Sequence, residues 1–126
     1  MIRGMLTVPA YNRFCKSLSC VSHVVQWGGA HVWKVGGPKG KVFAIAWDEG
    51  EKGVHFTFKC SKMSYDILKE QVGLRPAPYF ASRGMPWIQR VDDRSMDDAA
   101  LKDYLCESRR LAAQNLTKKL RLELGL

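Results

Sequence analysis

The chain has 126 residues, of which 46% are hydrophobic and 25% charged, and its net charge is +8. This size and composition predict a single globular domain spanning residues 1–126 and exclude a disordered chain. No apolar run approaches the roughly 20 residues of a membrane-spanning helix, and the first residues lack the apolar stretch of a signal peptide, so we expect no membrane partner.

The first segment predicts a short amphipathic helix over residues 8–19. Thr7 is a suitable N-cap, and Pro9 falls in the first turn, where a missing N–H costs nothing. Phe14 and Leu18 lie four residues apart, which gives the helix one apolar face. Residues 1–6 precede this helix and form a candidate disordered extension.

Residues 21–60 change to short strands separated by glycine-rich turns. The expected strands span 21–27, 30–35, 41–47 and 54–60. In the last of them Phe56 and Phe58 alternate with His55 and Thr57, as in a strand with one buried face. Four strands joined by short turns predict an antiparallel meander.

The first of these turns, Gly28-Gly29, is expected to be a two-residue hairpin turn with positive φ angles. That turn places Gln26 opposite His31 and His23 opposite Lys34. In this register the two histidines point to opposite faces of the sheet, so we expect them not to share a metal ion.

The second half of the chain predicts three helices and one strand. A helix over residues 61–73 can be capped by Ser61 or Ser64 and ended by Gly73. Residues 75–85 are expected to be an irregular loop, and residues 86–91 a fifth strand. Ser95 and Asp98 resemble a capping box for the next helix, and Thr117 can cap a last helix over 118–125.

The helix after Ser95 carries a stripe of residues with helical spacing, expected to face the core: Leu101, Tyr104, Leu105, Ser108, Leu111 and Ala112. The predicted order is thus helix, four-strand meander, helix, strand, helix, helix. This order predicts an α+β fold, a two-layer sandwich of an antiparallel sheet packed against helices.

Charge is distributed unevenly along the chain. Residues 1–47 contain six Lys and Arg and no acidic residue, whereas acids gather at 48–51 and 92–98. A segregated positive charge attracts polyanions such as nucleic acid. The same net charge would also keep a small domain soluble, so composition alone leaves both interpretations open.

Three groups of residues are candidate nucleic-acid contacts. Lysines flank the turn after Gly36, cations and an aromatic ring occupy the loop and strand over 75–87, and further cations lie near the C-terminus. Each group also has a structural explanation: protection of a sheet edge, anchoring of a loop in the core, or charges suited to the ends of helices. The candidates are Lys34, Lys39, Lys41, Arg75, Arg83, Trp87, Arg109, Arg110, Lys118, Lys119 and Arg121.

No catalytic, metal or cofactor site is predicted. The sequence contains neither a GxSxG elbow, a GxGxxG loop, nor a GxxxxGKS/T loop, and its glycine pairs fit hairpin turns better. No two cysteines form a CxxC pair typical of zinc ligands, so reduced thiols and a cytoplasmic location are expected. The cysteines are Cys15, Cys20, Cys60 and Cys106.

The segments VVQWGGAHVWKVGGPKGKVFAIAW and GLRPAPYFASRGMPWIQ, with a closing helix that ends in ELGL, resemble the MmcQ/YjbR family from Thr7 to Leu126. The resemblance implies a CyaY-like fold and no catalytic residues or cofactor. Family members are usually labelled DNA-binding, and their β-hairpin wings are proposed to touch the duplex. The turn after Gly36 is longer here than the tight GGK turn of the family, and it adds Lys39 to the tip.

Three functional hypotheses follow. The first is a non-enzymatic domain that binds nucleic acid, duplex DNA above all, mainly through phosphate contacts. The second is a protein-interaction module that presents the open sheet face to an acidic partner. The third, an enzyme or a small-ligand binder, rests on the loop over 75–87 and would require a pocket beneath it.

Overall fold

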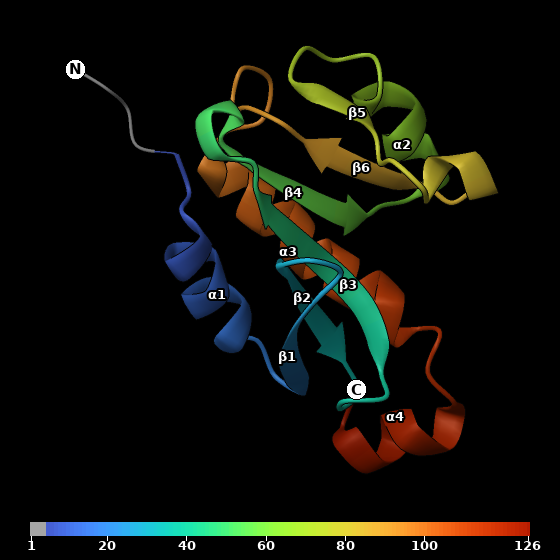
Figure 1. Cartoon of the computed structure of the whole chain (residues 1–126). Helices are drawn as coiled ribbons and strands as arrows, with labels where there is room; N and C mark the ends of the chain where they lie inside the picture. Colours follow the sequence, from blue (N-terminus) through green and yellow to red (C-terminus); the bar gives the residue numbers. More distant parts are fainter. Residues whose placement is uncertain (1–4) are drawn as a thin grey trace.

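The computed structural model describes residues 5–126, in which four helices pack with an open, six-stranded antiparallel sheet (Figure 1). The strand order is β1-β2-β3-β4-β6-β5. The strands are β1 (Val21–Gln26), β2 (Ala30–Val35), β3 (Lys41–Asp48), β4 (Val54–Lys59), β5 (Leu74–Pro76) and β6 (Trp87–Arg90). The helices are α1 (Val8–Lys16), α2 (Lys62–Leu68), α3 (Asp98–Ala113) and α4 (Lys118–Leu124). The predicted α+β class and the four-strand meander are confirmed.

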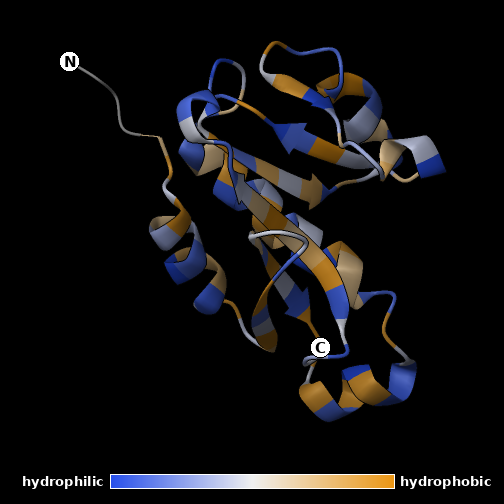
Figure 2. Ribbon diagram, in the orientation of Figure 1, coloured by the Kyte–Doolittle hydropathy of each residue, from blue (hydrophilic) through white to orange (hydrophobic). Residues whose placement is uncertain are grey.

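Helices α1 and α3 cover one face of the sheet and enclose the main core. Strand alternation sends Trp33, Phe56 and Phe58 toward these helices. Leu101 and Leu105 of α3 are fully buried against the sheet. Figure 2 shows why these elements pack together: apolar and polar residues alternate along the helices, which gives each helix an apolar side, and the central strands are largely apolar.

The other face of the sheet carries a smaller apolar cluster of Ala30, Val32 and Ile45. Phe80, from the segment between β5 and β6, packs against this cluster. A short 3-10 helix, Ala81–Arg83, follows Phe80. We call this side of the sheet the loop face, because the segment between β5 and β6 packs on it through Phe80.

The helix termini follow local capping chemistry. The hydroxyls of Thr7, Ser61 and Thr117 accept backbone N–H groups three residues later, which confirms these predicted N-caps. The predicted stripe of α3 is also confirmed, with Tyr104 and Leu111 only half-buried.

Three predicted helix ends were wrong. Helix α1 ends at Lys16 rather than residue 19. Helix α2 ends at Leu68 instead of reaching Gly73, although Gly73 does have a positive φ of 84°. Helix α3 is capped by Asp97, whose carboxylate accepts the N–H of Ala100, and not by Ser95. Met96 is 2% exposed, so the segment before α3 is held in the core and the helix starts only after it.

Residues 74–76 form an edge strand, β5, where an irregular loop was expected from residue 75. β5 pairs with β6, placing Leu74 opposite Arg90 and Pro76 opposite Ile88. A three-residue segment is too short to show alternation, and its proline is tolerated because this is an edge strand. The sequence pattern therefore held no signal for β5.

The turn of the β1–β2 hairpin has three residues, not the expected two. Trp27, Gly28 and Gly29 all have positive φ angles, of 52°, 75° and 111°. Gln26 consequently pairs with Ala30, and His23 with Trp33. This shift of one residue moves side chains to opposite faces, so the predicted placement of His23 and His31 was wrong.

At the N-terminus, Leu6 is 7% exposed and belongs to the main core, so the packed chain begins before Thr7. The expectation of a disordered extension otherwise falls on residues 1–4, outside the described part. From residue 5 onward, no helix is long and apolar enough to cross a membrane.

Candidate functional site

The β2–β3 hairpin ends in a tight turn at residues 36–40 that only glycine permits at key positions. Gly36 and Gly37 have φ angles of 96° and 91°. The N–H of Gly40 donates to the carbonyl of Gly37 at 2.8 Å. A Cβ atom on Gly40 would lie 2.0 Å from the carbonyl oxygen of Val35, so a larger residue would break the turn.

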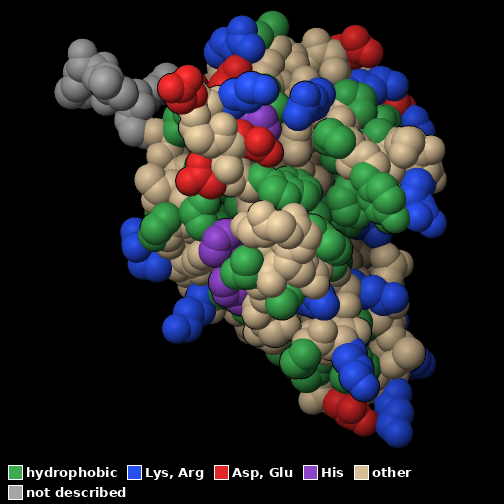
Figure 3. Space-filling model, viewed as in Figure 1, with side chains coloured by type: hydrophobic (Ala, Val, Ile, Leu, Met, Phe, Trp, Pro, Cys, Tyr) green, Lys and Arg blue, Asp and Glu red, His purple; other side chains and the backbone are tan. Residues whose placement is uncertain are grey.

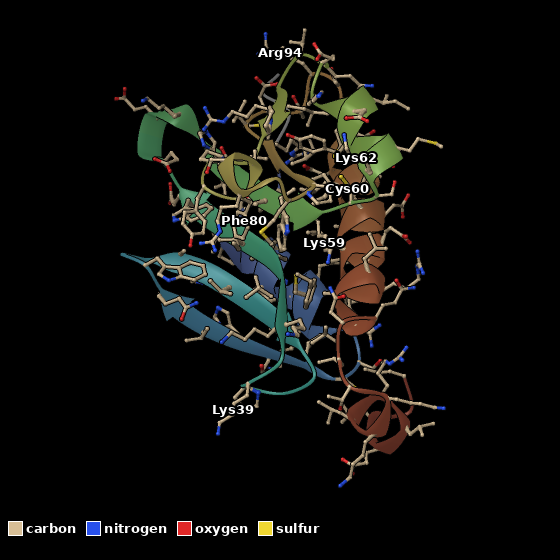
Figure 4. All side chains as sticks on the ribbon, turned by 90° about the vertical axis from the view of Figure 1, so that its right-hand side faces the viewer. Lys39, Lys59, Cys60, Lys62, Phe80 and Arg94 are labelled. Atoms are coloured by element: carbon tan, nitrogen blue, oxygen red, sulfur yellow. The ribbon has the colours of Figure 1, made fainter. Side chains whose placement is uncertain are left out.

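Three predicted cations gather at this turn. Lys39 and Lys41 are exposed, and Lys39 projects from the end of the hairpin (Figure 4). The Nζ of Lys34 donates to the carbonyl of Pro38 at 3.2 Å, which draws this ammonium toward the turn.

Helix α4 lies beside the same turn although it is distant in sequence. A Cβ atom on Gly36 would approach Leu116 Cδ2 to 2.8 Å, so Leu116 packs against the turn. The Sγ of Cys20 lies 3.5 Å from the carbonyl of Leu124, which ties the far end of α4 to the segment before β1. The turn and α4 together form what we call the basic end: Lys34, Lys39, Lys41, Lys118, Lys119 and Arg121.

The six cations of the basic end form no salt bridge in the described chain and outnumber the one acidic residue of α4, Glu123. By contrast, Lys62, Arg94 and Arg110 each pair with a carboxylate. In Figure 3 acidic and basic side chains are mixed at the upper end of the molecule, where the acidic β3–β4 turn lies, while basic side chains prevail at the lower end. The protein is therefore polarised along its length.

Lys59 is a further cation near the basic end that sequence analysis missed. Burial, and then the neighbouring charge of Lys41, lower the pKa of Lys59 below its ordinary value. Lys59 pairs with Trp87 across β4 and β6, so it stands on the loop face. Its position on the same face of the strand as His55 and Thr57, opposite Phe56 and Phe58, was the available signal.

An aromatic cleft of about 520 Å³ opens on the loop face beside the segment between β5 and β6. We call it the aromatic cleft; its lining residues are Trp27, Trp47, Pro78, Tyr79 and Phe80. Trp27 is 57% and Tyr79 66% exposed, so both rings are accessible to solvent. Figure 3 shows hydrophobic side chains gathered in the middle of the visible face. The sequence pattern indicated this segment but not Trp27 and Trp47, which come from a distant turn and a distant strand.

The second predicted group is thus divided by the structure. Trp87 is 3% exposed and stacks under Phe80, with ring centroids 4.5 Å apart, so its ring supports the cleft instead of presenting a free face. Arg83 is exposed and its Nη1 donates to the hydroxyl of Tyr79 at 2.7 Å. Arg75, on edge strand β5, donates twice to Gln89 Oε1 and lies away from the basic end.

In the third group, Arg109 and Arg110 of α3 are already engaged. The guanidinium of Arg109 donates to the carbonyl and hydroxyl oxygens of Ser19, joining α3 to the segment before β1. Arg110 pairs with Glu107 on the same helix. Lys118 and Lys119 remain exposed on α4, and Arg121 is half-buried.

The two histidines that were expected on opposite faces are neighbours. His23 Nε2 lies 3.1 Å from His31 Nδ1, and the Nδ2 of Asn12 lies 3.3 Å from the same nitrogen. The Oδ1 of Asn12 accepts the indole N–H of Trp33. In the described part of the chain, no group of three His, Cys, Asp or Glu side chains is placed to hold a metal ion.

Comparison with known proteins identifies relatives of this fold. The family model of YjbR matches residues 16–111, which is most of the chain. The crystal structure of Deinococcus radiodurans protein DR2400, described with a DUF419 domain, superposes with a TM-score of 0.83 at 20% identity. The match covers 97% of this chain and 90% of that one, so α1 and α4 belong to the shared fold. No curated protein matches the sequence.

Proposed function

The chain belongs to the YjbR family, and we propose that it binds nucleic acid by holding the phosphate backbone at its basic end. The observation that carries this proposal is the convergence of six cations from the β2–β3 turn and α4, none of them paired with a described carboxylate. The resemblance to MmcQ/YjbR proteins adds a reason to test duplex DNA first.

The physics of such an interface is mainly electrostatic. Each cation that neutralises a phosphate releases condensed counterions, so affinity falls steeply with salt, by about 0.9 in the log–log slope per contact. Glycines at the turn allow backbone N–H groups to come close to phosphate oxygens as well. The acidic β3–β4 turn lies at the opposite end of β3, where it does not oppose this contact.

The proposal is one of binding without catalysis, in the cytoplasm. All four cysteines are free, and burial raises the pKa of the Cys60 thiol to about 12, which suits a reducing compartment. An acidic protein partner would also be attracted to the basic end. Binding to such a protein would depend on its shape as well as its charge. An experiment can therefore distinguish a protein partner from nucleic acid.

The test compares two variants of equal net charge. One replaces Lys34, Lys39 and Lys41 with Gln at the basic end. The matched control makes the same replacement at Lys62 and Arg94, which lie far from Lys39 (Figure 4), and at Lys52 in the acidic β3–β4 turn. Binding of a labelled DNA duplex is measured by fluorescence anisotropy between about 50 and 200 mM salt, the range in which phosphate contacts lose most affinity.

We expect the basic-end variant to lose affinity and to reduce the salt slope by up to about 3 units, while the control stays close to wild type. Equal losses in the two variants would show that bulk charge and not the basic end attracts DNA. Absence of binding by the wild-type protein at low salt would refute the proposed function.

A further inference from the structure

We propose that the aromatic cleft binds an unpaired nucleobase of the nucleic acid held at the basic end, an inference that rests on the proposed function. A base inserted here would stack on the exposed rings of Trp27 and Tyr79. The protein would then prefer single-stranded nucleic acid, or duplex ends and distortions, over a regular duplex.

The chemistry of the lining fits a flat, apolar-faced ligand. Four of the five lining residues are aromatic and the fifth is Pro78, so every wall presents a ring. The volume of about 520 Å³ lies in the range of small-ligand sites. Base stacking on aromatic side chains tolerates any sequence, because every base has a π-face.

The cleft is built at a conformational cost. Three non-glycine residues in the described chain have positive φ angles, and two of them, Trp27 at 52° and Tyr79 at 73°, line this cleft. A left-handed backbone is unfavourable for bulky residues, and such strain concentrates at binding sites. Neither ring would be held here by local backbone preference alone.

Further contacts fix the ring of Tyr79 and the platform below it. Arg83 donates to the Tyr79 hydroxyl at 2.7 Å, and the hydroxyl of Ser82 donates to the Tyr79 carbonyl at 2.7 Å. Tyr79 meets Phe80 edge-on at 5.6 Å, and Phe80 in turn stacks on buried Trp87. The rings of Tyr79 and Phe80 are therefore preorganised, which reduces the entropy lost when a ligand binds.

Charge on the loop face selects a polyanion over an apolar peptide. Arg83 lies at the cleft, and Lys59 stands on the same sheet face beside Trp87 (Figure 4). Asp48 and Glu49 directly follow Trp47 in the chain and are exposed, so their charges favour phosphates near Lys59 over phosphates beside Trp47. Lys59 in turn lies near Lys41 of the basic end. Lys41 and Trp47 are separated by about 20 Å of β3, at about 3.4 Å per residue, a span that a short single strand covers.

The test uses a ten-nucleotide oligothymidylate and an abasic oligomer with the same phosphates but no bases. Trp27→Leu removes the ring but keeps an apolar side chain, and Trp27→Phe restores a ring. Ile67→Ala, at an exposed apolar residue of α2 outside the cleft, is the control. Binding is measured by anisotropy and by quenching of tryptophan fluorescence, and far-UV circular dichroism confirms that each variant is folded.

Stacking predicts that wild type binds oligothymidylate about 5- to 100-fold more tightly than the abasic oligomer, with quenching. Trp27→Leu should lose most of this difference without weakening abasic binding, whereas Trp27→Phe and Ile67→Ala should retain it. Equal affinity of wild type for the two oligomers would overturn the inference while the proposed function stood. Quenching by a proline-rich peptide but not by oligothymidylate would assign the cleft to a protein partner and overturn it too. If neither oligomer nor duplex binds at low salt, the proposed function is refuted, and the inference about the cleft, which rests on it, is refuted as well.

Discussion

Arg90 is a buried cation whose carboxylate partner is Asp98. Removing Asp98 should therefore lower the stability of the fold by more than removing an exposed carboxylate would. The Arg90 side chain is 1% exposed on the helix-covered side of β6. It donates to the carbonyl of Met96 and to Asp98 Oδ1, both at 2.9 Å, and its guanidinium lies 5.3 Å from the ring centroid of Phe56. Asp98→Ala leaves this buried cation without its carboxylate.

The expected cost follows from burial. Removing one partner of a fully buried ion pair costs about 3–5 kcal/mol. The Asp98 side chain is 32% exposed, so water can partly replace the carboxylate. We therefore expect Asp98→Ala to destabilise the protein by about 2–3 kcal/mol, including the loss of an acid in the first turn of α3. Arg90→Met removes the charge but keeps an apolar side chain, and should stay within about 1 kcal/mol of wild type.

The double variant, Arg90→Met with Asp98→Ala, is the decisive measurement. Because it leaves no unpaired cation, it should be more stable than Asp98→Ala alone. Urea unfolding followed by circular dichroism gives the three midpoints, compared at equal m-values. If Asp98→Ala and the double variant unfold at the same midpoint, the buried charge of Arg90 does not depend on Asp98 and the reasoning is refuted.

Two further predictions concern α3 and the histidine pair. Leu105→Ala, at a fully buried position, should destabilise the protein by about 2–5 kcal/mol. Asp103→Ala, on the exposed side of α3, should change stability by less than about 0.5 kcal/mol. Coincident urea melts of the two variants would contradict the assignment of these residues to the buried and exposed sides of α3. Burial, and then the neighbouring His31, lower the pKa of His23 below its ordinary 6.5. The unfolded chain therefore binds a proton at His23 more readily than the folded chain does, and stability should fall as the pH drops below about 6.5. His23→Gln should flatten that part of a stability–pH curve, and an unchanged curve would count against the coupling.

Local chemistry in the sequence was sufficient to predict most of the elements. Alternation in residues 54–60 and helical spacing from Leu101 to Ala112 involve neighbours within one strand or one helix. These patterns can therefore be recognised without knowing how the rest of the chain folds. Caps at Thr7, Ser61 and Thr117 depend on a side chain and an N–H three residues away. The uncompensated cations of residues 1–47 were likewise visible from composition.

Other features depend on which distant segments pack together. Trp87 was predicted to contact nucleic acid, yet β6 lies inside the sheet between β4 and β5, so Trp87 is buried, as is Arg90 on the same strand. Arg109 reads as a free cation until α3 brings it to Ser19. No local pattern specifies these contacts, because burial is decided by the elements on either side.

The α+β class, the N-caps at Thr7, Ser61 and Thr117, and a basic chain whose acids gather in separate segments all followed from the sequence. Three other features became visible only in the folded chain: the three-residue turn at Trp27, the docking of α4 beside the β2–β3 turn, and the cleft between Trp27, Trp47 and Tyr79. The difference lies in the sequence separation of the residues that interact. Periodicity and capping act over three or four residues, whereas register, docking and clefts are set by long-range burial and by strained backbone conformations that the whole fold must support.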